Sequence, residues 1–235
     1  MTSPLPPFAL LTSRLIILPT PSAVEISEYR AMYAHIHSLP EFCTMAFGHH
    51  YPPRITSDNA MKEQISREIS RNWNGKGLGD CAVGLWAGPQ DLGREIEVSA
   101  TKFRLVEGGQ LDNLLALLGN GSEQVTWVGY VGVRDATGLL PPRCIDDAPL
   151  PSWEELVEVR YGFVPSAWGK GYGTEAARSL MLWATRERGV RRFIAETEKA
   201  NSGSGKILGK LGFVKRETTE YWKEESEFEW EKVVS

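Results

Sequence analysis

The chain has 235 residues, of which 42% are hydrophobic and 24% charged, so it is long and apolar enough to bury a globular core. Its 26 basic and 30 acidic residues give a net charge of −4, which excludes a general polycation. The cysteines Cys43, Cys81 and Cys144 are far apart and lack a CxxC spacing, so we expect neither a disulfide scaffold nor a metal site.

The sequence also carries expectations about location. No run of roughly 18 apolar residues is present, and residues 1–11 have no positive charge ahead of a Pro-rich stretch. We therefore expect no membrane span and no secretory signal, and we predict a soluble, cytoplasmic monomer or homodimer.

The N-terminal half has the pattern of a strand, two helices and two paired strands. These are expected at residues 14–18 (strand), 23–38 and 58–71 (helices), and 80–86 and 125–133 (strands). Ser22 has capping-box spacing with Glu25, and Asp58 is the expected cap of the second helix. A loop rich in aromatic residues and histidines, residues 42–53, separates the helices.

Residues 87–124 separate the two paired strands. They include a strand-like run at 96–103, a turn at Gly108-Gly109, and a short apolar run at 114–118 that ends in a second glycine-rich break.

The C-terminal third has the most regular pattern. Strands are expected at 156–164 and 191–196, helices at 174–188 and 204–210, and a hairpin of 213–222 with 227–234. In the last strand Phe228 and Trp230 alternate with glutamates, which indicates a half-buried sheet face.

Positive charge is concentrated in this third. Residues 160–216 hold twelve Lys or Arg against four Glu, a net charge of +8, whereas residues 217–235 hold seven Glu against two Lys. A positive block in an acidic chain favours a local anionic ligand over a nucleic-acid surface. A solvated basic helix face is an equally good interpretation of the charge alone.

A glycine loop lies inside the positive block, at Trp168-Gly-Lys-Gly-Tyr-Gly-Thr174. Its glycines allow the backbone to approach a ligand closely, and the helix start that follows offers unpaired N–H groups. We therefore expect an anion there, with phosphate as the natural candidate. The alternative is a tight strand-to-helix turn that binds nothing.

Two nucleotide-binding motifs compete for this region. Gly171-Tyr-Gly173-Thr-Glu-Ala176 fits the dinucleotide fingerprint, with Glu196 at the ribose-binding position, but too little chain follows for the further βαβ units of that fold. Gly203-Ser-Gly-Lys206 is similar to a P-loop, but Ala200 replaces its first glycine and Ile207 its Ser or Thr. We therefore favour neither motif, since the first lacks the fold that it needs and the second lacks two of its residues.

Three blocks occur in order along residues 158–213. They are Glu158-Val-Arg-Tyr-Gly-Phe-Val-Pro165, Trp168-Gly-Lys-Gly-Tyr-Gly-Thr-Glu-Ala176 and Asn201-x-x-Ser204-x-x-Ile-Leu-x-Lys-Leu-Gly-Phe213. Together they resemble the GNAT N-acetyltransferase superfamily, most closely its ribosomal-protein-alanine (RimJ/RimL-like) branch. The resemblance implies an α+β (mixed α/β) fold, with a mostly antiparallel central sheet flanked by helices and a strand–Gly-loop–helix cofactor site. Residues 87–124 are where the chain departs from the family, as an insertion. Because the strands on both sides of this insertion are assigned to one sheet, we expect a single domain over residues 1–235.

The resemblance implies acetyl-CoA as the cofactor, bound without a metal. Its pyrophosphate would lie on the backbone N–H groups of the glycine loop, and its pantetheine arm along the strand edge at 161–164. The implied cofactor residues are Tyr161, Phe163, Val164, Trp168, Gly169, Lys170, Gly171, Tyr172, Gly173, Thr174, Asn201, Ser204 and Lys206, with Arg178 as a further source of positive charge.

Acetyl transfer to an amine needs a base near the amine and a hydrogen-bond donor near the sulfur. The resemblance makes Glu158 the first candidate for the base, with an ion pair to Arg160 as the structural alternative, and Glu196 is the second candidate. Ser204 is the expected donor to the sulfur, and Asn201 is expected to contact the cofactor. Helix capping is the alternative role for either.

The acceptor is expected to lie in an aromatic cleft that holds a protein N-terminus or a small amine. The expected lining residues are Phe47, His49, His50 and Tyr51 on one side and Tyr221 and Trp222 on the other. Ordinary loop packing is the alternative role for the histidines. We predict direct acetyl transfer to a primary amine, since no cysteine suggests a covalent intermediate. The alternative function is a non-catalytic acyl-CoA-binding or sensor protein.

Overall fold

The computed structural model describes residues 6–48, 51–98, 101–119, 121–137, 149–216 and 227–234. Its strands are β1 Phe8–Leu11, β2 Leu15–Pro19, β3 Gly79–Trp86, β4 Arg94–Val98, β5 Thr101–Glu107, β6 Val125–Asp135, β7 Val157–Phe163, β8 Arg192–Glu198, β9 Val214–Arg216 and β10 Glu227–Val233. Its helices are α1 Thr20–Ala23, α2 Ser27–Ile36, α3 Pro40–Phe47, α4 Asp58–Glu68, α5 Asn74–Lys76, α6 Gly108–Leu117, α7 Tyr172–Arg188 and α8 Ser202–Leu211. None of the helices in these ranges is long and apolar enough to cross a membrane.

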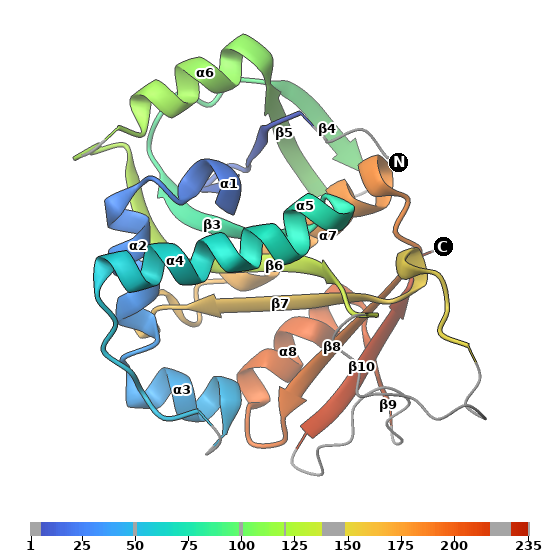
Figure 1. Ribbon diagram of the computed structural model, residues 1–235. Helices are drawn as coiled ribbons and strands as arrows, with labels where there is room; N and C mark the ends of the chain where they lie inside the picture. The colour runs from blue at the N-terminus through green and yellow to red at the C-terminus, as the bar shows by residue number, and fades with distance from the viewer. Residues whose placement is uncertain are drawn as a thin grey trace.

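The described strands form one ten-stranded sheet in the order β4-β5-β1-β2-β3-β6-β7-β8-β10-β9 (Figure 1). Every neighbouring pair is antiparallel except β7 with β8, which are parallel. The predicted mixed α/β fold with a mostly antiparallel sheet is therefore confirmed.

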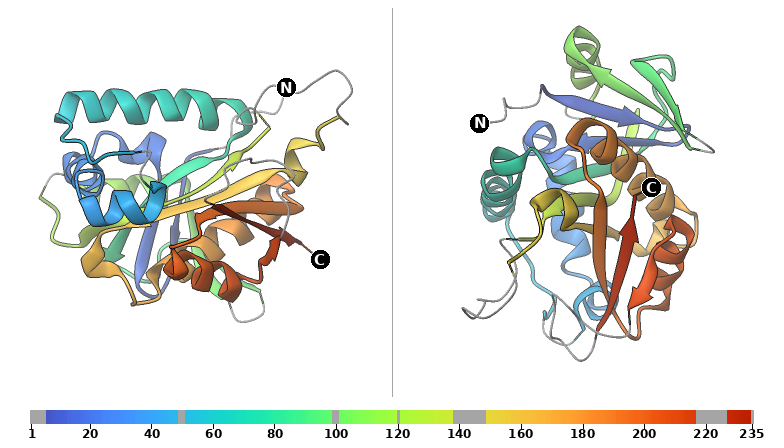
Figure 2. Two further views of the ribbon diagram at one scale, coloured as in Figure 1. Left: turned by 90° about the horizontal axis from the view of Figure 1, so that it is seen from below. Right: turned by 90° about the vertical axis from the view of Figure 1, so that its right-hand side faces the viewer.

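Helices cover both faces of the sheet (Figure 2). Successive strand residues point to opposite faces, so Val131 of β6 packs in the core that contains Leu180 and Trp183 of α7. Its neighbour Tyr130 packs in the second core, with Tyr33 of α2. The sheet therefore separates two apolar layers, and the site described below lies where β7 meets α7.

The C-terminal third follows the predicted order closely. The strand, helix, strand and helix predicted at 156–164, 174–188, 191–196 and 204–210 are β7, α7, β8 and α8. The predicted pairing of 80–86 with 125–133 is also present, as β3 with β6. The predicted hairpin is the antiparallel pair of β9 and β10, although its residues 217–226 lie outside the described part of the chain.

The first predicted helix, 23–38, is wrong in its start and its cap. Pro21 stands in the first turn of α1, where its fixed φ favours helix initiation, and Ser22 lies within that short helix. The chain then extends at Ile26, and α2 begins at Ser27 without a side-chain cap. The predicted helix is therefore shorter at both ends as α2, and the separate short helix α1 precedes it.

The second predicted helix begins correctly but has a different cap. Ser57 caps α4 by accepting a hydrogen bond from the Ala60 N–H at 3.4 Å. The Asp58 carboxylate instead accepts from Arg30 Nε and Nη2 at 2.7 and 2.8 Å. The helix continues beyond the predicted end through a π-helical turn at Ile69–Trp73 and into α5. The predicted cap residue Asp58 is therefore bound by Arg30 of α2, a tertiary partner that local spacing does not reveal.

Residues 42–53 were expected to be a loop, but α3 occupies the first half of this segment. Pro40 lies in the first turn of α3, and Phe42 and Cys43 are buried on its inner face. Burial of this face stabilises a helix of only eight residues, which is too short to show clear periodicity in the sequence.

The 87–124 segment adds to the main sheet. Its single predicted strand at 96–103 is wrong, because β4 and β5 form an antiparallel pair in which Val98 stands opposite Thr101. β5 in turn pairs with β1, a strand that the sequence analysis missed beside the N-terminal prolines. α6 begins at the predicted Gly108-Gly109 turn and buries Leu111 and Leu114.

Candidate active site

β7 and β8 form the one parallel pair in the described sheet, and they pair only at their beginnings. Val157 is opposite Phe193 and Glu158 opposite Ile194, whereas β7 continues to Phe163 and β8 to Glu198. The strands therefore separate beyond these positions. The later part of β7 has no ladder to β8, and such an edge can pair with an extended ligand.

The glycine loop, residues 168–174, connects β7 to the 17-residue helix α7. Gly169 and Gly171 have φ of +74° and +82°, which glycine adopts without strain, and Gly171 is the N-cap of α7. The N–H groups of residues 169–174 donate to no acceptor in the described chain. Unpaired N–H groups at the positive end of a long helix favour a bound anion, so this loop fits the pyrophosphate of acetyl-CoA.

The glycine loop and α7 contact the end of β7 and the helix α8. Trp168 donates from Nε1 to the Phe163 carbonyl at 2.7 Å, which joins the loop to the end of β7. At Gly173 an added Cβ would lie 3.1 Å from Ile207 Cδ1, so the glycine allows α7 to pack closely on α8. Arg178 donates to the Lys210 carbonyl at 2.8 Å, so its guanidinium group is engaged at the far end of α8.

Asn201 and Ser204 lie at the start of α8, beside β7. Asn201 Oδ1 accepts from the Ser204 N–H at 3.0 Å, and Asn201 Nδ2 donates to the Met45 carbonyl at 2.8 Å. Asn201 therefore caps α8 and ties it to α3. Tyr161 Oη donates to the Ser204 carbonyl at 3.2 Å, while the Ser204 hydroxyl makes no hydrogen bond with the described residues. Lys206 follows on the exposed side of α8.

Glu158 is buried on β7, where its Oε2 accepts from Arg134 Nε at 2.5 Å. The two residues stand directly opposite each other in the β6–β7 pair. Arg160 instead faces Asp80, with its Nε 3.7 Å from Asp80 Oδ1. The structural alternative, an ion pair of Glu158 with Arg160, is therefore wrong in its partner, because Glu158 pairs with Arg134, which stands directly opposite on the neighbouring strand.

Glu196 lies on β8 directly opposite Glu229 of β10, and both carboxyl groups are on one sheet face. Burial of Glu196, followed by the charges of Glu227, Glu158 and Glu229, raises the pKa of Glu196 to about 10. Glu196 is therefore protonated at neutral pH, where a neutral carboxyl group can donate a hydrogen bond but cannot take up a proton, which argues against it as the base. Glu229 is only 2% exposed, so the glutamates of β10 do not form the solvent face of that strand.

Aromatic rings form a connected row on the α3 side. The ring centre of Phe47 lies 5.5 Å from that of Tyr51 and 6.0 Å from that of His37. The ring centres of His37 and Tyr130 are 6.1 Å apart. His37, which was not predicted, contacts the Tyr33 carbonyl through Nδ1 at 2.9 Å, and burial lowers its pKa. The other predicted acceptor residues, His49, His50, Tyr221 and Trp222, lie outside the described residues.

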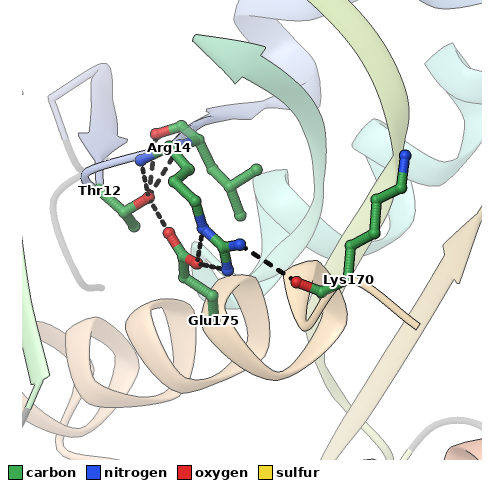
Figure 3. Close-up of polar contacts among 5 residues, drawn as sticks. Thr12, Arg14, Lys170 and Glu175 are labelled. Atoms are coloured by element: carbon green, nitrogen blue, oxygen red, sulfur yellow. Dashed lines mark hydrogen bonds and ion pairs between the residues drawn. The ribbon is translucent and has the colours of Figure 1, made fainter. Parts of the chain in front are cut away.

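Arg14 is the residue near the glycine loop that the sequence analysis missed. It lies between β1 and β2, and Figure 3 shows its guanidinium between the Glu175 carboxylate and the Lys170 carbonyl. Thr12 of the same turn donates to the other Glu175 oxygen at 2.5 Å. Because 161 residues separate Arg14 from Glu175, no local spacing could reveal the contact.

Solved structures of acetyltransferases share this fold. The structure of RimL, a ribosomal L7/L12 alpha-N-protein acetyltransferase in complex with coenzyme A, superposes with a TM-score of 0.54 at 10% identity, over 95% of this chain and 96% of that one. The microcin C7 self-immunity acetyltransferase MccE, in complex with acetyl-CoA and AMP, superposes with a TM-score of 0.53 at 12% identity, over 95% and 94% of the two chains.

The sequence is also similar to acetyltransferase sequences. A relative from Aspergillus fumigatus, the FsC-acetyl coenzyme A-N(2)-transacetylase, is 30% identical over 94 residues, which are 40% of this chain and 40% of that protein. The match therefore spans two fifths of the relative's length. Residues 20–214 match the family model of the acetyltransferase (GNAT) domain. This match includes the glycine loop, the separated strands and both flanking helices, and the chain therefore belongs to the GNAT acetyltransferase family, which uses acetyl-CoA.

Proposed function

We propose that this protein transfers the acetyl group of acetyl-CoA directly to a primary amine, either a protein N-terminus or a small-molecule amine. One observation carries the proposal: the unpaired N–H groups of the glycine loop lie next to the free edge of β7. Proteins whose names specify an alpha-N-protein acetyltransferase or an N(2)-transacetylase support an amine as the acceptor.

We assign the cofactor to residues along this edge. When bound, acetyl-CoA supplies an activated acetyl thioester. Backbone N–H groups of residues 169–174 hold its pyrophosphate, and Lys170 and Lys206 add positive charge. The edge of residues 161–164 orients the pantetheine arm, as a neighbouring strand would. Trp168 keeps the loop joined to β7.

Glu158 is the base in this proposal and acts on the amine through a water molecule. Arg134 occupies Glu158 Oε2, whereas Oε1 makes no hydrogen bond with the described residues and can accept one from water. Ser204 supplies the donor to the departing sulfur, because its hydroxyl is free of described partners and the residue is tied to Tyr161 of β7. Glu196 contributes as a neutral carboxyl group that can orient a polar neighbour.

The acceptor lies on the α3 side of the sheet. Phe47 and the 59%-exposed Tyr51 offer it an aromatic surface, and the bond between Asn201 and Met45 holds α3 beside the cofactor side of the site. The four predicted residues outside the described ranges, His49, His50, Tyr221 and Trp222, remain part of the proposed lining. An aromatic surface accepts a peptide N-terminus or an apolar amine.

Two measurements on the wild-type protein test the function. Acetyl-CoA is first titrated by calorimetry, and release of free thiol is then followed across a panel of peptides and small amines. Binding together with acceptor-dependent thiol release is the expected result. Binding with no turnover on any acceptor would favour the non-catalytic sensor, and absence of binding would contradict both functions.

A further inference from the structure

We propose that Arg14 is a positioning residue for the cofactor, which holds the peptide unit between Lys170 and Gly171 so that the Gly171 N–H faces the bound anion. The inference rests on the proposed place of the cofactor at the glycine loop. Arg14 comes from the turn between β1 and β2, far from the three sequence blocks that define the site.

Three contacts fix the Arg14 guanidinium (Figure 3). Nε donates to Glu175 Oε2 at 2.9 Å, and Nη2 forms an ion pair with the same oxygen. Nη1 donates to the Lys170 carbonyl at 3.1 Å. The guanidinium carbon also lies 4.8 Å from the centre of the Tyr172 ring. Because the guanidinium is rigid and planar, fixing two of its nitrogens on Glu175 also fixes the direction of the third.

Thr12 prevents Glu175 from turning away. Its hydroxyl donates to Glu175 Oε1 at 2.5 Å and accepts the Leu15 N–H at 2.9 Å, and Thr12 itself is buried. Both oxygens of Glu175 are therefore held by the β1–β2 turn. Hydrogen bonds therefore join the β1–β2 turn to the first turn of α7, and the bond from Arg14 to the Lys170 carbonyl joins the glycine loop to both.

The contact with the Lys170 carbonyl sets the direction of the next N–H group. In a trans peptide the C=O and N–H groups point in opposite directions, and the described chain has no cis peptide. With the Lys170 carbonyl directed at Arg14, the Gly171 N–H points away from Arg14. Glycine tolerates φ of either sign, so this peptide unit between Lys170 and Gly171 could rotate at little cost if nothing held its oxygen.

Arg14 also neutralises Glu175, and the two effects must be separated. Glu175 lies in the first turn of α7, where its negative charge is favourable for the helix dipole but repels a phosphate. A purely electrostatic role predicts that Arg14 matters only while Glu175 is charged. A positioning role predicts that Arg14 matters in either case, because its bond to Lys170 does not depend on that charge.

The test is the affinity of coenzyme A, measured by calorimetry without any acceptor. Arg14→Ala should raise the Kd about tenfold, the effect of losing one charge-assisted hydrogen bond. Arg67→Ala is the matched control, because it removes the same charge from an exposed pair with Glu63 on α4, and it should leave the Kd within about twofold. An unchanged Kd for Arg14→Ala, with the wild type binding normally, would overturn the inference alone, whereas a wild type that does not bind would contradict the proposed function.

The double variant Arg14→Ala/Glu175→Gln separates positioning from neutralisation. We expect its Kd to stay about fivefold or more above that of the wild type, because the Lys170 carbonyl remains unheld. Recovery of wild-type affinity would overturn the positioning role. In the cofactor-free protein, the NMR order parameter of the Gly171 amide should fall in Arg14→Ala. An unchanged order parameter would also contradict the inference.

If Arg14→Ala does not fold, Arg14→Lys replaces it. A single ammonium group keeps the charge but cannot reproduce the two contacts with Glu175 Oε2 together with the bond to Lys170. It should therefore weaken coenzyme A binding measurably, and full wild-type affinity would overturn the inference.

Discussion

At the scale of single residues, the two predicted acids differ in their surroundings. Glu158 is held at one oxygen by Arg134, whereas Glu196 stands opposite Glu229 with its pKa raised to about 10. The sequence identified both positions from their strands. It could not show why the pKa of Glu196 is raised, because β10 lies beside β8 only in the folded chain.

Glu158→Gln should lower kcat about 100-fold at neutral pH, the usual contribution of a general base, with the amine that the acceptor panel identifies. The Kd of acetyl-CoA should stay within about twofold, because the side chain does not contact the phosphates in this proposal. Glu63→Gln, on the exposed face of α4, is the control for loss of a carboxylate. Unchanged turnover in Glu158→Gln would place the base elsewhere.

Glu196 makes stability depend on pH in a definite direction. Its folded-state pKa of about 10 lies above the ordinary value of 4.5, so the folded chain holds a proton that the unfolded chain releases between these values. Stability from this group is therefore complete below about pH 4.5 and falls as the pH rises toward 10. Glu196→Gln removes this titration. The melting temperature of Glu196→Gln minus that of the wild type should therefore be larger near pH 9 than near pH 4. Parallel melting curves of the two proteins across this range would contradict the assignment.

At the scale of elements, segments with a regular sequence pattern were predictable, and short segments stabilised by tertiary packing or pairing were not. β7, α7, β8 and α8 combine apolar periodicity with glycine boundaries, so local sequence locates them. α3 and β1 are stabilised by what they pack or pair with, and neither has enough length for a clear pattern. The same distinction holds at the site, where the glycine loop was visible in the sequence and Arg14 was not.

The link between α3 and α8 gives an element-scale prediction. Asn201→Ala removes the cap of α8 and the bond to Met45, so it should lower the free energy of unfolding by about 1–2 kcal/mol. Asn201→Asp keeps the capping oxygen but loses the donor, and it should cost less. Urea unfolding measures both, with Ser202→Ala as an exposed control on the same helix. Equal stability of Asn201→Ala and the wild type would show that the cap contributes nothing.

At the scale of the whole molecule, residues 87–124 extend the sheet that carries the site. β5 pairs with β1, and the turn after β1 carries Arg14 to the glycine loop. The segment was recognised as unusual in the sequence, but its place in the sheet depends on a pairing between chain regions nearly a hundred residues apart. We propose on this basis that the chain is a single domain.

Leu114→Ala tests this organisation. Leu114 of α6 is fully buried, so the cavity should cost about 2–5 kcal/mol, and unfolding should remain one cooperative transition at a lower denaturant midpoint. Leu117→Ala, at a 37%-exposed position on the same helix, should cost much less. Two separate transitions, with only one shifted by Leu114→Ala, would indicate an independently folding segment.

The central claim is that the glycine loop holds the cofactor, and one measurement tests it most directly: calorimetric titration of coenzyme A into the wild type and Gly171→Glu. Gly171 has φ of +82° and an N–H group in the proposed anion site, so a glutamate there strains the backbone and repels the phosphates. Gly109→Glu is the control, because an added Cβ at Gly109 meets nothing within 4 Å. The account predicts binding to the wild type and Gly109→Glu and none to a folded Gly171→Glu. Binding of coenzyme A to Gly171→Glu with wild-type affinity would contradict it.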